Sequence, residues 1–301
     1  MHRRKALVST LVCLAAAAVS PWLRSADTPG PAGERALEWT KRLVDLGPRP
    51  SGSQAHQRQQ ALITGALRQL KCELVEEQFT AQTPNGPIRM QNIIAKFPGD
   101  SGRVVVISGH YDTYHRPGLA FVGANDGGSS AGLLLALAEQ LSGERQRDDV
   151  WLVFFDGEES IRAWAGDDHT YGSRHQAEVW RSDGTLSRVK ALINVDMIGD
   201  ADLGVVYEGY STPWLRDLVW ETARGLGYID VFGPKTPAYV EDDHRPFLEA
   251  GVPAVDLIDF NYGPGNRYWH TEQDTPDKLS SRSFAVVLHV LDDLLARLAE
   301  R

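Results

Sequence analysis

The sequence predicts an α/β protein in three layers, with a mostly parallel central sheet flanked by helices. Two observations lead to this fold class. Short apolar runs rich in β-branched residues alternate along the chain with amphipathic segments of helical spacing. Such alternation is typical of parallel strands joined by helices that cover both faces of the sheet. The 301 residues show no internal repeat and no low-complexity linker after Gly33, which favours a single domain over residues 33–301.

The N-terminus has the pattern of a secretory signal peptide. Residues 2–5 are basic, residues 6–19 are almost wholly apolar, and Pro21 interrupts the run. The run is too short for a comfortable membrane span, and an uncleaved anchor is the alternative. We therefore assign residues 1–26 to a signal peptide, and we expect a secreted or periplasmic protein whose mature chain does not span a membrane.

Composition and charge restrict the class of partner. The hydrophobic fraction of 42% and the charged fraction of 24% are ordinary for a globular protein. The formal charge of −9 at pH 7 argues against a nucleic-acid-binding protein, which usually has a basic face. We expect a monomer with no nucleic-acid partner.

Residues 33–97 predict two helices and a β-hairpin. Helical apolar spacing recurs in two segments, the first of which stops at Gly47-Pro48 after a flexible lead-in over residues 29–33. The Asn85-Gly86 pair between two strand-like runs is a typical hairpin turn. These patterns place helices at 36–46 and 54–70 and strands at 72–79 and 88–97.

Strands and helices alternate through the rest of the chain. The unbroken β-branched run at residues 104–108 predicts a fully buried strand. Similar apolar runs and amphipathic segments follow this strand. A short segment over residues 247–250 ends at Gly251. The predicted strands are 104–108, 151–155, 189–195 and 252–258, and the predicted helices are 127–141, 171–180, 214–226 and 284–298.

The strand at 151–155 runs into two adjacent carboxylates, Glu158 and Glu159. Adjacent carboxylates repel each other, so a cation or a shared proton usually accompanies them. The carboxyl edge of an open α/β sheet is also where ligands bind. Taken alone, such a pair is most often a solvated acidic turn. We expect instead that Glu159 binds zinc and that Glu158 moves protons, because other residues point to the same edge.

Two residues, His110 and Asp196, closely follow predicted strands, and Asp126 and His270 lie in loops that reach the same edge. Each also has an ordinary structural explanation. His110 is explained as a buried core histidine and Asp196 as a strand-end turn residue. Asp126 is explained as a helix cap and His270 as a loop histidine packed on an aromatic ring. Together with Glu159 they supply the nitrogen and oxygen ligands that zinc prefers. The sequence therefore predicts a zinc site at this edge.

Five motifs that occur in order resemble the zinc aminopeptidase and glutaminyl cyclase superfamily. They are Ser108-Gly109-His110-Tyr111-Asp112, Gly123-Ala124-Asn125-Asp126, Phe154-Phe155-Asp156-Gly157-Glu158-Glu159, Asp196-Met197-Ile198-Gly199 and Trp269-His270-Thr271. The resemblance runs from about Gln91 to Leu279, and it implies the three-layer fold and zinc-dependent catalysis of that superfamily.

The two branches of the superfamily differ in metal count. In the aminopeptidase branch, the resemblance implies one zinc held by residues His110, Asp126 and Asp196 and a second held by Asp126, Glu159 and His270. In the glutaminyl cyclase branch, the second set alone holds a single zinc. All ligand types are present, so both branches remain open on this ground.

Several details resemble the cyclases more closely. Trp164 leads into residues 171–175, the loop 241–248 resembles one that carries a catalytic aspartate at Asp242, and Trp269 directly precedes His270. Ordinary core packing would also explain the tryptophans. Residues 127–132 are closer to the peptidase pattern, and the cysteine pair of animal cyclases is absent. On balance we favour a cyclase with one zinc per chain.

The cyclase resemblance implies conversion of the N-terminal glutamine of a peptide or protein into pyroglutamate, with release of ammonia. Glu158 would transfer protons, Asp242 and Asp196 would form an acid network that holds the substrate amine, and Trp164 and Trp269 would wall the pocket. The alternatives are an aminopeptidase in which Glu158 activates zinc-bound water, and a domain that binds metal or peptide without turnover.

Overall fold

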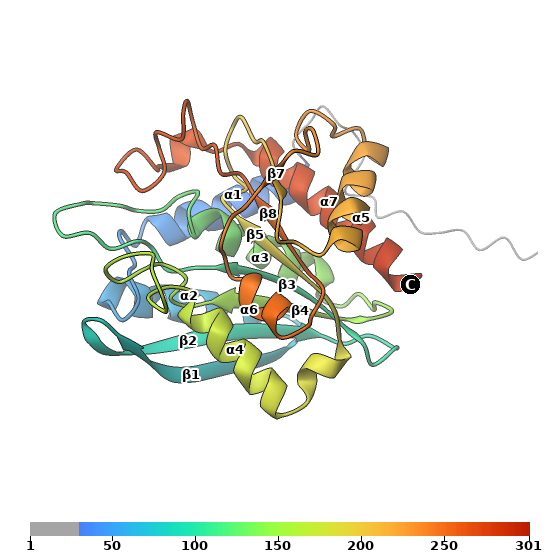
Figure 1. Ribbon diagram of the computed structural model, residues 1–301, viewed down its shortest axis with the longest axis horizontal. Helices are drawn as coiled ribbons and strands as arrows, with labels where there is room; N and C mark the ends of the chain where they lie inside the picture. Colours follow the sequence, from blue (N-terminus) through green and yellow to red (C-terminus); the bar gives the residue numbers. More distant parts are fainter. Residues whose placement is uncertain (1–29) are drawn as a thin grey trace, which may run out of the picture.

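The computed structural model describes residues 30–301, in which a six-stranded sheet lies between two layers of helices (Figure 1). The strand order is β1-β2-β4-β3-β5-β8. Strands β4, β3, β5 and β8 run parallel, whereas β1 and β2 form an antiparallel hairpin at one edge. Their bounds are β1 Glu73–Thr83, β2 Gly86–Phe97, β3 Val104–His110, β4 Asp149–Phe155, β5 Val189–Asp196 and β8 Ala254–Ile258. The predicted fold class is confirmed.

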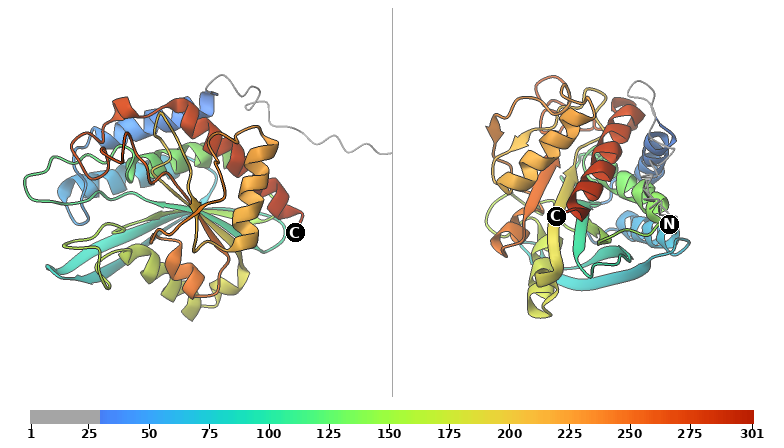
Figure 2. Two further views of the ribbon diagram at one scale, coloured as in Figure 1. Left: turned by 45° about the horizontal axis from the view of Figure 1, so that its top comes forward. Right: turned by 90° about the vertical axis from the view of Figure 1, so that its right-hand side faces the viewer.

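Helices cover both faces of this sheet, as the left view of Figure 2 shows. On one face lie α1 Pro31–Val44, α2 Gln54–Leu67, α3 Gly128–Leu141, α5 Pro213–Gly225 and α7 Ser281–Ala299. On the other face lie α4 Tyr171–Ser182 and the short α6 Arg245–Glu249.

Alternate residues of the central strands supply two separate apolar cores. In β3, Val105 and Ile107 belong to the core beneath the larger helical layer, and Val104 and Val106 belong to the core beneath α4 and α6. This division follows from the two-residue period of a strand. All seven residues of β3 are buried, as its unbroken β-branched run predicts.

Two glycines let helix α3 approach its neighbours closely. A Cβ atom on Gly132 would lie 2.1 Å from Thr40 Oγ1 in α1, and one on Gly109 would lie 2.7 Å from both Ser130 Cβ and the Val195 carbonyl oxygen. Any other residue at these positions would push the elements apart. The close fit brings the start of α3 against the ends of β3 and β5.

Several predicted boundaries differ from the observed ones. The expected lead-in over 29–33 is wrong from Pro31 onward, because α1 begins there with a proline whose fixed φ angle suits a first helical residue. Strand β3 extends to His110, so this histidine belongs to the strand. The elements that were not predicted are a two-stranded parallel sheet, β6 Tyr207–Glu208 with β7 Pro237–Ala238, and the 3-10 turns Thr185–Arg188 and Pro276–Lys278.

The predicted signal peptide, residues 1–26, lies outside the described residues and stays a prediction. Within residues 30–301, no helix is both long and apolar enough to cross a membrane.

Candidate active site

The predicted site residues come from five separate segments that meet at the carboxyl edge of the parallel strands. His110 and Asp196 are the last residues of β3 and β5, and the acids at 158–159 follow β4. Asp126 lies two residues before α3, and His270 lies in the loop between β8 and α7. Parallel strands end on the same side of a sheet, which explains why the sequence positions converge.

Two groups of metal-ligand type share Asp126. His270 Nε2 lies 3.1 Å from Glu159 Oε1 and 3.2 Å from Asp126 Oδ2. His110 Nε2 lies 3.2 Å from Asp126 Oδ1 and from Asp196 Oδ1. Within each group the ligand atoms lie no more than 4.8 Å apart. The two oxygens of Asp126 thus face different groups.

The electrostatics of the Asp126–Glu159–His270 group fit a divalent cation. Burial and the neighbouring Asp126 raise the pKa of Glu159 to about 7 although His270 opposes them, and its Oε2 atom has no hydrogen-bond partner within residues 30–301. Burial lowers the pKa of His270, but Glu159 and Asp126 outweigh it and raise that pKa to about 11. A bound metal would relieve this excess of negative charge, and one histidine with two carboxylates is a donor set that zinc accepts.

Two further carboxylates hold the backbone of the ligand-bearing turns. Asp274 accepts hydrogen bonds from the backbone N–H groups of residues 125 and 126, at 2.8 and 3.1 Å. Asp112 does the same for the N–H groups of Glu158 and Glu159, at 3.1 and 3.3 Å. Each carboxylate therefore fixes the direction in which a ligand side chain leaves the main chain, as partners around metal ligands commonly do.

A fully buried arginine supports the loop that leads to Asp126. The guanidinium of Arg49 donates hydrogen bonds to the carbonyl oxygens of Val122 and Gly123, at 2.8 and 3.1 Å. Burial lowers the pKa of Arg49 to about 10, against the opposing pull of nearby acids such as Asp274. The arginine remains a cation at neutral pH and offsets part of the negative charge of the site.

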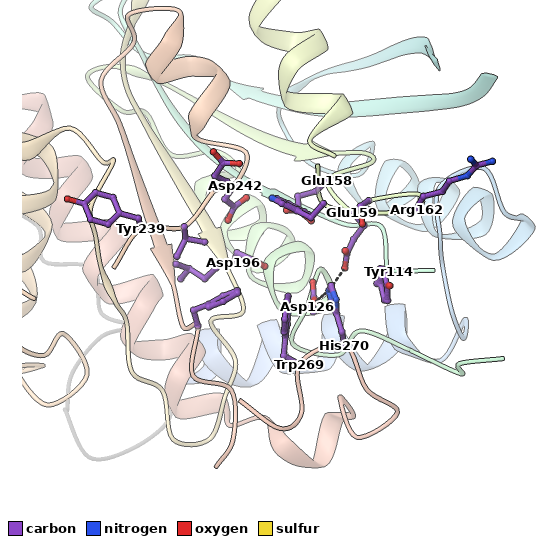
Figure 3. A pocket seen from close by; sticks show the side chains of 17 residues that line it. Tyr114, Asp126, Glu158, Glu159, Arg162, Asp196, Tyr239, Asp242, Trp269 and His270 are labelled. Atoms are coloured by element: carbon purple, nitrogen blue, oxygen red, sulfur yellow. Dashed lines mark hydrogen bonds and ion pairs between the residues drawn. The ribbon is translucent and has the colours of Figure 1, made fainter. Parts of the chain in front are cut away.

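A pocket of about 420 Å³ opens over the Asp126–Glu159–His270 group (Figure 3). Its lining includes all of the residues that were predicted to act in catalysis or substrate binding, together with aromatic and apolar neighbours. They are Tyr114, Asp126, Glu158, Glu159, Ser160, Arg162, Ala163, Trp164, Asp196, Tyr239, Val240, Glu241, Asp242, Ile258, Phe260, Trp269 and His270. His110 does not line this pocket.

Glu158 is nearly buried at the side of the pocket. Burial raises the pKa of its carboxyl well above the usual range; His110 opposes this, and the acids Glu159, Asp242 and Asp243 add to it. A carboxyl group with a raised pKa exchanges protons readily near neutral pH. The group therefore has the environment of a general acid and base.

Aromatic rings enclose both faces of the His270 imidazole. The rings of Tyr114 and Trp269 each stack on it with centroids 4.2 Å apart, at interplanar angles of 3° and 22°. Trp164 lies elsewhere in the pocket and stacks on His169 at 4.2 Å. Both tryptophans stay about two-fifths exposed, at 36% and 40%, so they remain available to a substrate.

Asp242 and Asp196 both line the pocket, but the described residues show no direct hydrogen bond between them. Asp196 Oδ1 contacts His110 Nε2, whereas the Asp242 carboxyl lies near the buried carboxyl of Asp256. Burial and the nearby acids Asp256 and Asp196 raise the pKa of Asp242 well above its usual range. The acid network therefore extends away from the pocket through Asp256.

Sequence reasoning missed Tyr114, Asp112, Asp256 and Asp274. Asp256 carried a signal, because a lone acid within the apolar run of β8 is unusual for a buried strand. Asp112 lies inside the motif at residues 108–112, but its role depends on a hydrogen bond with the N–H of Glu158, 46 positions later. The contacts of Tyr114 and Asp274 span still longer distances in the sequence.

Comparisons with known proteins show the family of this chain. Residues 92–294 match the family described as Peptidase family M28. A glutaminyl-peptide cyclotransferase of Drosophila melanogaster is 30% identical over 281 residues, which cover 83% of this chain and 78% of that protein.

Solved structures show the same fold. The crystal structure of a glutaminyl cyclase from an Acidobacteriales bacterium has 36% sequence identity and a TM-score of 0.88, and covers 96% of this chain and 100% of that chain. A zinc-dependent exopeptidase from Parabacteroides distasonis, at 22% identity and a TM-score of 0.78, covers 89% of this chain and 98% of that chain and shares the fold. The predicted resemblance to the zinc aminopeptidase and glutaminyl cyclase superfamily is confirmed, and the chain belongs to peptidase family M28.

Proposed function

We propose that this protein is a zinc-dependent glutaminyl-peptide cyclotransferase, which converts the N-terminal glutamine of peptides and proteins into pyroglutamate and releases ammonia. The similarity to glutaminyl-peptide cyclotransferases over most of the chain supports this activity. One structural observation carries the proposal. All members of the Asp126–Glu159–His270 group line the same pocket as Glu158 and Asp242.

A single zinc held by that group is the metal content we propose. A catalytic zinc keeps one coordination position open toward substrate. The Asp126–Glu159–His270 group meets this condition because it opens to the pocket, whereas His110, at 1% exposure, does not line it. When bound, zinc would supply Lewis-acid polarisation of the γ-amide carbonyl of the substrate glutamine.

The protein groups account for the proton transfers of the reaction. The α-amine nitrogen forms a bond to the side-chain amide carbon, and the bond from that carbon to the amide nitrogen breaks. Glu158 takes the proton that the amine loses and delivers it to the leaving nitrogen, which departs as ammonia. One carboxyl group can perform both transfers, and no water is consumed because the substrate amine is the nucleophile.

The remaining pocket residues bind and orient the substrate. Asp196 and Asp242 offer carboxyl oxygens to the substrate amine, and Trp164 and Trp269 contact the apolar part of the glutamine side chain. Figure 3 places Asp242 and His270 on different sides of the pocket. A glutamine side chain held between these residues would contact Asp242 and the proposed zinc position at the same time.

The decisive assay follows two products from a dipeptide that begins with glutamine. We expect zinc-loaded protein to release ammonia and to leave an intact pyroglutamyl product, without free amino acids. A dipeptide that begins with alanine is the matched control, because it has no γ-amide to lose. Release of free glutamine would contradict the proposal and identify an aminopeptidase.

An aminopeptidase is the second candidate, because the His110–Asp126–Asp196 group offers a second metal position. Glu158 would then act as the general base for attack of water on a peptide carbonyl. Metal analysis separates the two candidates: one zinc per chain at full activity supports the cyclase, and a requirement for two supports the peptidase.

Export and a monomeric state complete the proposal. The basic and apolar pattern of residues 1–26 supports removal of a signal peptide during secretion or transport to the periplasm. Sequencing of the N-terminus of the mature protein tests the first point, and light scattering on a gel-filtration column tests the second.

A further inference from the structure

A row of four buried side chains leads from the pocket to the small β6–β7 sheet. Asp242 lines the pocket, Asp256 lies in β8, His244 lies just before α6, and Glu208 ends β6. None is more than 2% exposed. The proposed mechanism uses only Asp242, so the burial of three further ionisable groups behind it requires an explanation.

Glu208, at the far end of the row, is held as an anion by four donors. Its carboxylate accepts hydrogen bonds from the Ser211 N–H and Oγ at 2.6 and 2.8 Å, the Tyr210 N–H at 2.8 Å and the Val240 N–H at 3.3 Å. Burial by itself raises the pKa of Glu208, but the nearby His244 ring and the Tyr210 N–H outweigh it and lower the pKa to about 2. This end of the row is therefore a fixed negative charge.

His244 lies between two carboxyl groups. Its Nε2 atom is 3.3 Å from Glu208 Oε2, and its Nδ1 atom is 3.8 Å from Asp256 Oδ2. Burial lowers the pKa of His244, and Arg245 lowers it further against the pull of Glu208, so the ring is neutral. A neutral ring beside a permanent anion carries its hydrogen on Nε2, which leaves the Nδ1 lone pair facing Asp256.

Asp256 connects this ring to the pocket. Its Oδ1 accepts a hydrogen bond from Asn194 Nδ2 at 3.2 Å, and its Oδ2 has no hydrogen-bond partner within residues 30–301. The Oδ2 atom of Asp242 also lacks a hydrogen-bond partner within residues 30–301, and a hydrogen bond between two neighbouring carboxyls requires a proton on one of them. Burial and the neighbouring acids raise the pKa of both carboxyls well above the usual range, which favours a protonated carboxyl in the row.

We propose that His244 is a positioning residue for Asp242. Glu208 sets the tautomer of the ring, so Nδ1 accepts a hydrogen from Asp256. Asp256 in turn holds Asp242 with one carboxyl oxygen free to accept a hydrogen bond from the substrate amine. The separation of 3.8 Å exceeds a hydrogen bond of about 3 Å, so a small rotation must close it. Hydrogen bonds in active sites are often long without substrate and shorten when it binds. This inference rests on the proposed cyclase activity.

Three substitutions at position 244 separate the two contacts of the ring. The amide of His244→Asn occupies the place of Nδ1 and still reaches Asp256, whereas the amide of His244→Gln occupies the place of Nε2 and reaches only Glu208. His244→Phe keeps the ring volume and removes both contacts. Ammonia release, zinc content and melting temperature are measured for each variant and for the unmodified protein.

We expect His244→Phe and His244→Gln to lower kcat by about 10- to 100-fold, the loss typical of partners behind an active-site group, with KM changed less than about threefold. The Asn variant should recover most of the activity. Zinc content should be equal in all four proteins. Equal activity in all variants, or losses that follow only the melting temperature, would overturn the proposal.

A second measurement does not depend on turnover. Nitrogen NMR of the histidine rings should show His244 with its hydrogen on Nε2, and Asp242→Asn should shift the Nδ1 signal. A His244 ring that does not respond to Asp242→Asn overturns the coupling. If the unmodified protein releases no ammonia from any glutamine peptide, the proposed function fails, and this NMR experiment still decides the coupling by itself.

Discussion

The carboxylate of Asp274 lies 3.1 Å from the backbone N–H of Asp126, 148 residues earlier in the chain. The same carboxylate accepts a hydrogen bond from the N–H of Asn125 and one from the Tyr262 hydroxyl at 2.7 Å. It thus joins the loop that follows His270 to the loop that carries the shared ligand. The separation between the candidate ligands Asp126 and His270 therefore depends on the hydrogen bonds of Asp274.

Asp274→Asn should weaken zinc binding. An amide has only one acceptor oxygen, so its NH₂ group would face one of the two backbone N–H donors and displace the turn. We expect zinc affinity to fall by about 10- to 100-fold in competition with a chelator. Asp277→Asn, on the surface of the same segment, is the control and should bind zinc normally. Equal affinities of the two variants would remove Asp274 from this role.

Glu158→Gln should stop ammonia release and leave zinc bound. The amide keeps the size of the side chain but exchanges no proton, so the rate should fall by about 100- to 10,000-fold. Glu178→Gln, exposed on α4, serves as the control. Activity within tenfold of the unmodified protein would exclude Glu158 as the group that transfers protons.

The two tryptophans should differ in what they affect. Trp164→Ala removes a pocket wall that stacks on His169 and not on His270, so KM should rise about tenfold or more while zinc content stays the same. Trp269→Ala also removes one of the rings stacked on His270, so zinc affinity should fall as well. Titration with a chelator alongside steady-state kinetics distinguishes the two effects. Identical zinc affinities in both variants would contradict the prediction for Trp269.

Glu208 should make stability depend on pH below the neutral range. Its pKa is about 2 in the folded protein against 4.5 ordinarily, so the unfolded chain binds more protons between these values. The stabilisation, at most about 3 kcal/mol, is complete above pH 4.5 and disappears as pH falls toward 2. Urea unfolding of the protein and of Glu208→Gln should therefore give free energies that converge as pH falls. A difference that stays constant from pH 7 to pH 3 would contradict this.

Two helical glycines form a matched pair for the packing of α3. Gly132→Ala should destabilise the protein by about 1–3 kcal/mol, because its Cβ would lie 2.1 Å from Thr40 Oγ1. Gly65→Ala in α2 meets no atom within 4 Å and should stabilise the protein by roughly 0.5–1 kcal/mol through helix propensity. Thermal unfolding should show opposite shifts, and shifts of the same sign would refute the close-packing argument.

The sequence by itself determined the fold class and the set of candidate ligands. Period-two and helical patterns are local properties of the chain, and residues that end parallel strands reach one edge wherever the strands fall in the order. Thus position alone predicted that Glu159, shortly after β4, and Asp196, at the end of β5, reach the same edge of the sheet. The same reasoning placed the boundary of α1 wrongly by several residues, since helix ends carry weaker signals.

Only the tertiary structure decided which groups lie behind the candidate ligands and behind Asp242. Asp112 and Asp274 hold the turns of candidate ligands, and His244 and Asp256 lie behind Asp242. All four do so through contacts with residues 12 or more positions away, and no local pattern encodes such contacts. The structure also decided that the His270 group opens to the pocket and that His110 does not. The physical reason is that burial and hydrogen-bond partners, which set the charge and direction of an acidic side chain, arise only when distant segments pack together.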